Sequence, residues 1–123
     1  MTPETNLLRQ VHPSFVQNGQ ITSQVFRPTP KDESQLSVEN GELISAVASF
    51  ERFVASGENR SVGVMAVTFG ECSSLALAVI EDGDPYPEHC SIDFGGKHAG
   101  QIERASKILK HQAQARGWLH RAP

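Results

Sequence analysis

The pattern of apolar and polar residues along the chain predicts six strands and two helices. Two stretches repeat apolar side chains every three or four residues, which is the period of an amphipathic helix. Shorter stretches alternate apolar with polar residues or are almost wholly apolar, which is typical of strands. The expected strands cover residues 6–11, 20–27, 36–38, 61–69, 74–80 and 89–94, and the expected helices cover residues 42–55 and 98–116.

Proline and glycine residues indicate where these elements end. Pro13 donates no backbone hydrogen bond and closes the first strand, and Asn18-Gly19 suits the tight turn of a hairpin. Gly57 and Gly117 follow the two helical stretches, where glycine commonly takes the left-handed conformation that ends a helix. Gly70-Glu71 predicts a tight turn, which would make residues 61–69 and 74–80 an antiparallel pair.

Strands followed by a helix, more strands and a terminal helix predict an α+β fold. We expect one domain over residues 1–123, with a mostly antiparallel sheet of five or six strands and residues 1–5 frayed. Both helices should pack on one face of this sheet. Leu43, Val47 and Phe50 would then face the same side as Ile102 and Leu109.

Composition narrows the class of protein without identifying it. With 38% hydrophobic and 20% charged residues, the chain resembles ordinary globular domains. The net charge of −3 gives no general attraction to nucleic acid, although a basic C-terminal helix leaves that partner open. The longest apolar run, residues 75–80, is too short to span a membrane, and no signal peptide is visible. We expect no membrane contact and no cofactor.

The two cysteines, Cys72 and Cys90, form no CxxC motif. They are expected to be small buried residues in a reducing compartment, which predicts a cytoplasmic protein. A zinc site built from both cysteines with His89 and His98 is not predicted. Adjacent residues of a strand, such as His89 and Cys90, point to opposite faces and cannot easily bind one ion.

The densest run of polar side chains lies between Ile21 and Val38. Arginine offers a planar fork of donors, so Arg27 with Ser23 and the nearby Lys31 could bind a phosphate group. Asp32, the next residue, is a further candidate binding residue of this run. The alternative is a solvated edge strand followed by an exposed loop.

Two of the five histidines are candidate general acids or bases, because imidazole titrates near neutral pH. His12 stands at a strand end and His89 opens a strand. Together with Ser23 and Arg27 they could support phosphoryl or glycosyl transfer, provided that the first and last strands come together. Alternatively, each histidine only caps a strand or forms a hydrogen bond within a turn.

Three other residues are candidate binding groups near the C-terminus. Lys97 follows Gly95-Gly96 at the start of the last helix, where anions are attracted, although the stretch lacks the length of a P-loop. Trp118 with Arg121 could anchor a protein interface. Equally, Trp118 could fold back onto its own core.

The strings HPSF, TSQVFRPTPKD, LSV and PEHCSIDF resemble stretches of short bacterial proteins. This resemblance implies no activity and no site residue. The TSQVF stretch after the strand that carries Arg9 is also loosely similar to the cores of ADP-ribosyltransferases. That similarity implies a catalytic glutamate on a later strand, for which Glu71 and Glu88 are the candidates.

Two functions from different classes follow from these observations. The first is a small cytoplasmic bacterial accessory or regulatory domain that binds a macromolecular partner, most simply a protein. The alternative is a small enzyme that acts on a phosphate-containing or nucleotide ligand through His12, Arg27 and His89. An enzyme would bring these three groups into one concave pocket.

Overall fold

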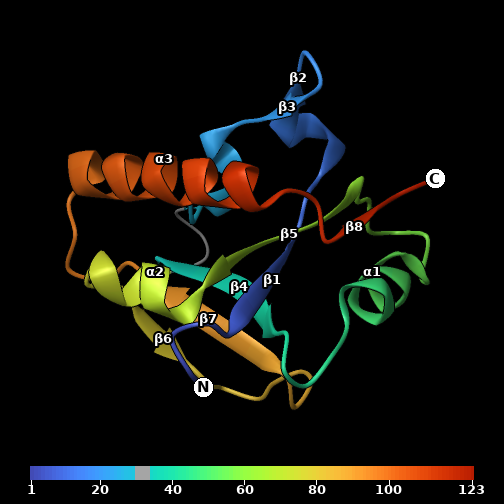
Figure 1. Ribbon diagram of the computed structural model, residues 1–123, viewed down its shortest axis with the longest axis horizontal. Helices are drawn as coiled ribbons and strands as arrows, with labels where there is room; N and C mark the ends of the chain where they lie inside the picture. The colour runs from blue at the N-terminus through green and yellow to red at the C-terminus, as the bar shows by residue number, and fades with distance from the viewer. Residues whose placement is uncertain (30–33) are drawn as a thin grey trace.

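A six-stranded antiparallel sheet organises the chain in a computed structural model that describes residues 1–29 and 34–123 (Figure 1). The strand order is β6-β7-β4-β1-β5-β8. These strands are β1 (Asn6–Gln10), β4 (Gln35–Asn40), β5 (Gly63–Thr68), β6 (Ala78–Ile80), β7 (His89–Asp93) and β8 (His120–Arg121). The other elements are the hairpin β2 (Val16–Gln17) and β3 (Gln20–Ile21), the 3-10 turns η1 (Pro13–Phe15) and η2 (Ser23–Phe26), and the helices α1 (Ala46–Val54), α2 (Phe69–Ser74) and α3 (Ala99–Arg116). The predicted α+β fold with an antiparallel sheet is confirmed.

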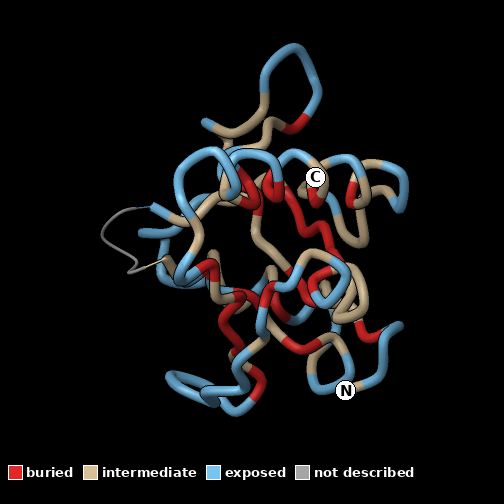
Figure 2. The backbone as a smooth tube through the Cα atoms, turned by 90° about the vertical axis from the view of Figure 1, so that its left-hand side faces the viewer, coloured by how far each residue is buried: buried red, intermediate tan, exposed pale blue. Residues whose placement is uncertain are grey.

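The two longer helices lie on opposite faces of the sheet, contrary to the expected placement on one face. Leu7 of β1 belongs to the main core with Leu109 of α3. Leu8, the next residue, belongs to a smaller cluster with Phe50 of α1. Successive side chains of a strand point to opposite faces, and both leucines are apolar, so each face of β1 needs its own cover. Buried stretches, red in Figure 2, run through the middle of the molecule.

Helix α1 begins later than predicted and buries less of its apolar surface. Ser45 caps its N-terminus by accepting a hydrogen bond from the amide of Ala48 at 3.1 Å. Leu43 therefore lies before the helix and is 63% exposed, and Val47 is 45% exposed. The prediction that both belong to the core is wrong, and of the three predicted residues only Phe50 packs against the sheet.

Two segments predicted as strands contain helical turns instead. Residues 20–27 form the short β3 and then η2, which buries Val25 and Phe26 against α3. The predicted turn after β5 is the start of α2, which begins with a capping box between Thr68 and Glu71. The strand expected over residues 74–80 shrinks to β6.

The terminal helix agrees with the prediction, since α3 is capped by His98 and ends before Gly117, whose φ is 88°. The chain then returns along β5 as β8. At the other terminus, the carbonyls of Pro3 and Thr5 accept hydrogen bonds from the first amides of α2. In the part of the chain described, no helix is long and apolar enough to cross a membrane.

Candidate functional site

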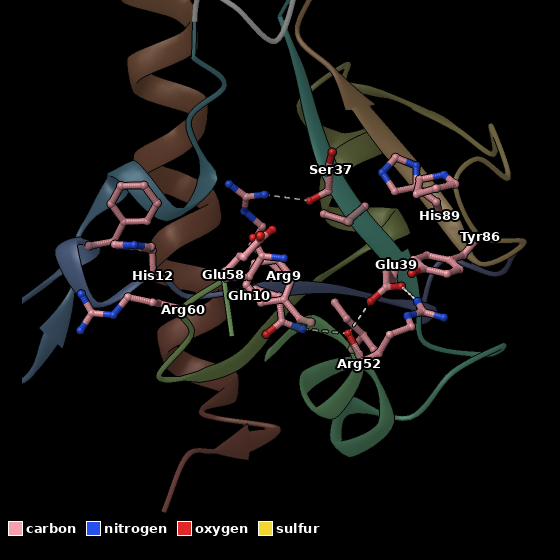
Figure 3. A pocket seen from close by; sticks show the side chains of 17 residues that line it. Arg9, Gln10, His12, Ser37, Glu39, Arg52, Glu58, Arg60, Tyr86 and His89 are labelled. Atoms are coloured by element: carbon pink, nitrogen blue, oxygen red, sulfur yellow. Dashed lines mark hydrogen bonds and ion pairs between the residues drawn. The ribbon is translucent and has the colours of Figure 1, made fainter. Parts of the chain in front are cut away.

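A cavity of about 650 Å³ opens where β1 and β4 part (Figure 3). The two strands pair at Leu7–Asn40 and Leu8–Glu39. At the next residue, the Arg9 guanidinium bridges across instead, with Nε donating to the carbonyl of Val25 at 2.9 Å and Nη1 to that of Ser37 at 3.0 Å. The floor of the cavity is therefore held by one arginine side chain bonded to backbone on both sides.

The cavity has two sides, which we name by their histidines. On the His12 side, Figure 3 shows His12 and Arg60, and on the His89 side it shows His89, Tyr86 and Glu39. Arg60 reaches the first side because the chain that follows it pairs with Val11, directly before His12. The amide of Val62 donates to the carbonyl of Val11, and the amide of Val11 donates to the carbonyl of Gly63.

The two histidines line one cavity but stand far apart across it. One row of paired residues crosses three neighbouring strands, from Leu8 of β1 through Glu39 of β4 to His89 of β7. His12 lies four residues beyond Leu8 along the chain. With about 3.3 Å per residue along a strand and about 4.8 Å between strands, the Cα atoms of His12 and His89 are about 16 Å apart. They can contact opposite ends of a ligand but not one reacting atom.

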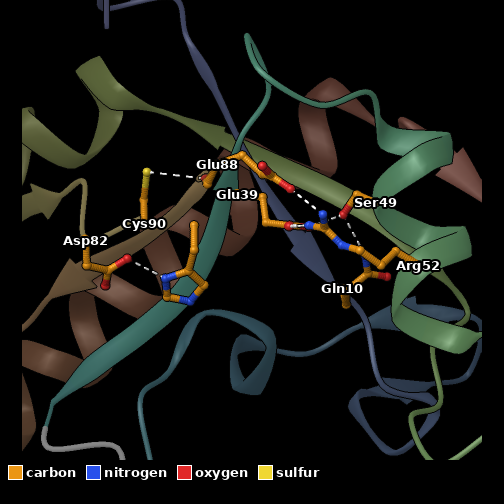
Figure 4. A network of polar contacts seen from close by, with 8 residues as sticks. Gln10, Glu39, Ser49, Arg52, Asp82, Glu88 and Cys90 are labelled. Carbon is orange, nitrogen blue, oxygen red and sulfur yellow. Dashed lines mark hydrogen bonds and ion pairs between the residues drawn. The ribbon is translucent and has the colours of Figure 1, made fainter. Parts of the chain in front are cut away.

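His89 is held in one orientation by a carboxylate. Its Nδ1 lies 2.5 Å from Oδ1 of Asp82 (Figure 4). Oδ2 of Asp82 accepts a hydrogen bond from Ser91 at 2.7 Å. Burial alone would raise the pKa of the Asp82 carboxyl, but the hydrogen bonds from His89 and Ser91 outweigh it and lower that pKa below its usual 3.8. An ionised carboxylate only accepts, so Nδ1 of His89 carries the proton. Nε2 of the neutral ring then offers a lone pair.

His12 is held in the opposite tautomer. Its Nδ1 accepts a hydrogen bond from the backbone amide of Ser14 at 3.0 Å, and the Ser14 hydroxyl lies 2.8 Å from the same atom. A backbone amide can only donate, so Nδ1 is unprotonated and Nε2 of the neutral ring carries the hydrogen. His12 therefore presents a donor, whereas His89 presents an acceptor.

A charged cluster builds the wall of the His89 side (Figure 4). Arg52 of α1 forms ion pairs with Glu39 and Glu88, and its Cζ lies 3.6 Å from the centre of the Tyr86 ring. The hydrogen bond from Arg52 lowers the pKa of the Glu88 carboxyl below its usual 4.5. Burial alone would lower the pKa of Arg52, yet the two glutamates raise it. The Glu88 carboxylate is thus ionised at neutral pH, and the guanidinium is fixed against an aromatic ring.

Ser49 connects this cluster to the strands beneath it. The Ser49 hydroxyl donates to Glu39 and accepts from Nε2 of Gln10 at 2.9 Å, and the Gln10 carbonyl in turn accepts from Ser61 at 2.9 Å. Ser49 is 1% exposed. Helix α1 is therefore attached to this part of the sheet by polar contacts.

The structure brings two of the predicted catalytic residues to the cavity and leaves two away from it. His12 and His89 line it, but Ser23 and Arg27 do not. Ser23 belongs to η2 and Arg27 ends it, and η2 packs against α3. Sequence reasoning missed Asp82, although that residue lies in the acidic turn just before the strand of His89.

The predicted binding residues do not gather at the cavity. Lys31 and Asp32 lie outside the described residues. Lys97 lines a smaller cavity of about 190 Å³ beside α3. Trp118 is partly buried and packs against the main core, with Arg121 5.1 Å from its ring.

The two glutamates suggested by the similarity to ADP-ribosyltransferases have structural partners. Glu71 lies on α2, not on a strand, and accepts from Arg116 at 2.8 Å. Glu88 immediately precedes β7 and is paired with Arg52. Neither carboxylate lines the cavity.

Among the described residues, no group of three or more His, Cys, Asp or Glu side chains is placed to hold a metal ion. Comparison of the chain with protein-family models, with curated proteins and with solved structures finds no match. The arrangement of side chains is therefore the basis for assigning a function.

Proposed function

We propose that this protein is a small enzyme that acts on a phosphate-containing or nucleotide ligand in the cavity between β1 and β4. The observation that carries this proposal is the Asp82–His89 pair, in which the carboxylate fixes the ring with Nε2 as an acceptor. Orienting a neutral imidazole in this way is what a general base requires. The cavity volume also falls in the usual range for small-molecule sites.

The roles of the two histidines differ in this proposal. His89 takes a proton from a water that attacks C1′ of the ligand's ribose, and Asp82 stabilises the imidazolium that forms. The N-glycosidic bond to the base breaks, and the base leaves with the electron pair of that bond and takes a proton from solvent. His12, on the other side of the cavity, binds the ligand through its Nε2–H. Arg27 has no role here, and Arg60 takes the place that Arg27 had in the hypothesis drawn from sequence.

A screen of nucleotides tests the proposal. The protein is incubated with AMP, ADP, ATP and NAD, and products are followed by phosphorus NMR and chromatography. His89→Ala should lower the rate of turnover by about 10²- to 10⁴-fold, the usual contribution of a general base, while thermal melts verify folding. His111→Ala, an exposed histidine on α3, is the matched control and should leave the rate unchanged.

Asp82→Asn should also slow turnover and change its dependence on pH, since an asparagine amide no longer fixes the tautomer of His89. Absence of turnover for every nucleotide, or turnover that survives His89→Ala, would overturn the proposal.

A second candidate is a cytoplasmic accessory or regulatory protein that binds a protein partner. It is favoured by Leu43 and Val47, two exposed apolar side chains four residues apart near the start of α1. Trp118 supports it less, because its ring packs on its own domain. The two free, buried cysteines support the cytoplasmic location.

Comparative capture from a bacterial extract tests this candidate. A partner that binds the wild type but is lost from a variant carrying Leu43→Ser and Val47→Ser would support it. Equal capture by both proteins, or by neither, would reject it.

A further inference from the structure

We infer that the cavity binds a mononucleotide in one orientation, with the base on the His89 side and the phosphate on the His12 side. This inference rests on the proposed function and adds the substrate class and its polarity. It is carried by the flat Arg52–Tyr86 platform, by the charges of the two sides and by the opposite tautomers of the two histidines.

The platform is suited to a planar ring. Arg52 covers one face of the Tyr86 ring at 3.6 Å, yet Tyr86 remains 43% exposed, so its exposed surface belongs to the other face and the edge. Two carboxylates hold the guanidinium in place, which makes the stack rigid before a ligand arrives. Nucleic acid bases stack on aromatic rings and on arginine in this manner.

Charge makes the His89 side less suited to a phosphate than the His12 side. On the His89 side Glu39 lines the cavity and Glu88 and Asp82 stand behind its wall, against the single guanidinium of Arg52. On the other side Glu58 and Arg60 line the cavity with one charge of each sign. A phosphate placed on the His89 side would face like charges, which is unfavourable. A neutral base avoids this repulsion.

The hydrogen-bonding atoms agree with the same polarity. Nε2 of His89 offers an acceptor, which suits a sugar hydroxyl or an amino group of the ligand. The His12 side offers two donors that suit a phosphate, Nε2–H of His12 and the exposed guanidinium of Arg60, with the Glu58 carboxylate beside them. Because these groups are separated by about 16 Å between the histidine Cα atoms, the ligand must carry its ring and its anion at opposite ends.

Binding measurements by calorimetry test this orientation with four probes: AMP, adenosine, ribose 5-phosphate and inorganic phosphate. Tyr86→Ala should weaken AMP and adenosine about tenfold, because a stacking contact is lost, and leave ribose 5-phosphate unchanged. Arg60→Ala should weaken AMP and ribose 5-phosphate about tenfold and leave adenosine unchanged. Arg104→Ala, on the exposed side of α3, is the control and should change none of them.

Two results would overturn the inference. One is the reversed pattern, in which Arg60→Ala weakens adenosine or Tyr86→Ala weakens ribose 5-phosphate. The other is failure of AMP to bind the wild type more tightly than both of its fragments. Binding is measured here without turnover. If the protein shows the expected binding pattern but no turnover, the nucleotide site is supported and only the catalytic role of His89 is rejected.

Discussion

Replacing Ser49 by alanine should loosen helix α1 from the sheet, which makes it a sharp test of the polar attachment. Ser49 is 1% exposed, and its hydroxyl joins Glu39 of β4 to Gln10 of β1. The substitution removes both hydrogen bonds, and the alanine methyl group can replace neither. Glu39 keeps its ion pair with Arg52 and the Gln10 carbonyl keeps its hydrogen bond from Ser61, so the group that loses its acceptor is Nε2 of Gln10.

The magnitude follows from two opposing effects. A buried polar group left without its partner costs about 1–3 kcal/mol. Alanine favours the helix over serine by roughly 0.5 kcal/mol, which offsets part of that loss. The net loss in the free energy of unfolding should be about 0.5–2.5 kcal/mol, equivalent to a Tm lower by about 2–10 °C for a chain of this size.

Chemical and thermal denaturation of three variants provides the assay. Ser49→Ala is compared with Ser73→Ala, an exposed helical serine that should change stability by less than about 0.5 kcal/mol. The double variant of Ser49→Ala with Gln10→Ala should lose less than the sum of the single losses, because the two changes remove one shared bond. Additive losses, or a Ser49→Ala loss as small as that of the control, would refute the polar attachment of α1.

Three further predictions concern other parts of the fold. Burial raises the pKa of Cys72 to about 12 and that of Cys90 to about 11. Neither thiol should therefore react with a maleimide at pH 8 until the protein is unfolded by denaturant. Labelling at the rate of a free thiol would contradict this prediction. Gly63→Ala should lower Tm by several degrees, because the φ of 154° at residue 63 is unfavourable for alanine and an added Cβ would lie 2.5 Å from a backbone carbonyl of β8. An unchanged Tm would reject the close approach of β8 to Gly63. Burial alone would raise the pKa of Glu71, but its hydrogen bond from Arg116 lowers that pKa below 4.5 in the folded protein. The Glu71–Arg116 pair therefore stabilises the fold above pH 4.5, and this stabilisation is lost as the pH falls through the lowered pKa of Glu71. Arg116→Gln should flatten the decline measured between pH 5 and 3, and an unchanged pH dependence would contradict the assignment.

The sequence predicted those elements whose pattern is long and periodic. Helix α3 and strands β1, β5 and β7 fall close to their expected ranges, because their apolar positions are set by a large buried face. The short elements η2 and α2 were missed, since apolar residues such as Val25 and Phe26 fill a core equally well from a turn as from a strand. The Thr68–Glu71 capping box was visible in the sequence and would have predicted α2 correctly.

The site was only partly predictable for a different reason. His12 and His89 stand 77 positions apart in the chain, and they line one cavity only because β4 pairs with both β1 and β7. Strand order is a property of the whole sheet and cannot be read from any local stretch. Arg27 was an equally reasonable candidate by residue type, but η2 directs that segment toward α3 instead.

The polar attachment of α1 also bears on how a ligand site could be precise here. Apolar contacts carry no direction, so a helix held by them alone can slide over a sheet at little cost. Hydrogen bonds weaken steeply when their geometry is disturbed, so the bonds of Ser49 and Arg52 to strand residues fix the position of α1 along the sheet. Arg52 of the platform stands on that helix, and Tyr86 stands in the loop between β6 and β7, three residues before His89. A ligand ring stacked on Tyr86 would therefore be positioned relative to His89 both by α1, through Arg52, and by the short connection from Tyr86 to β7.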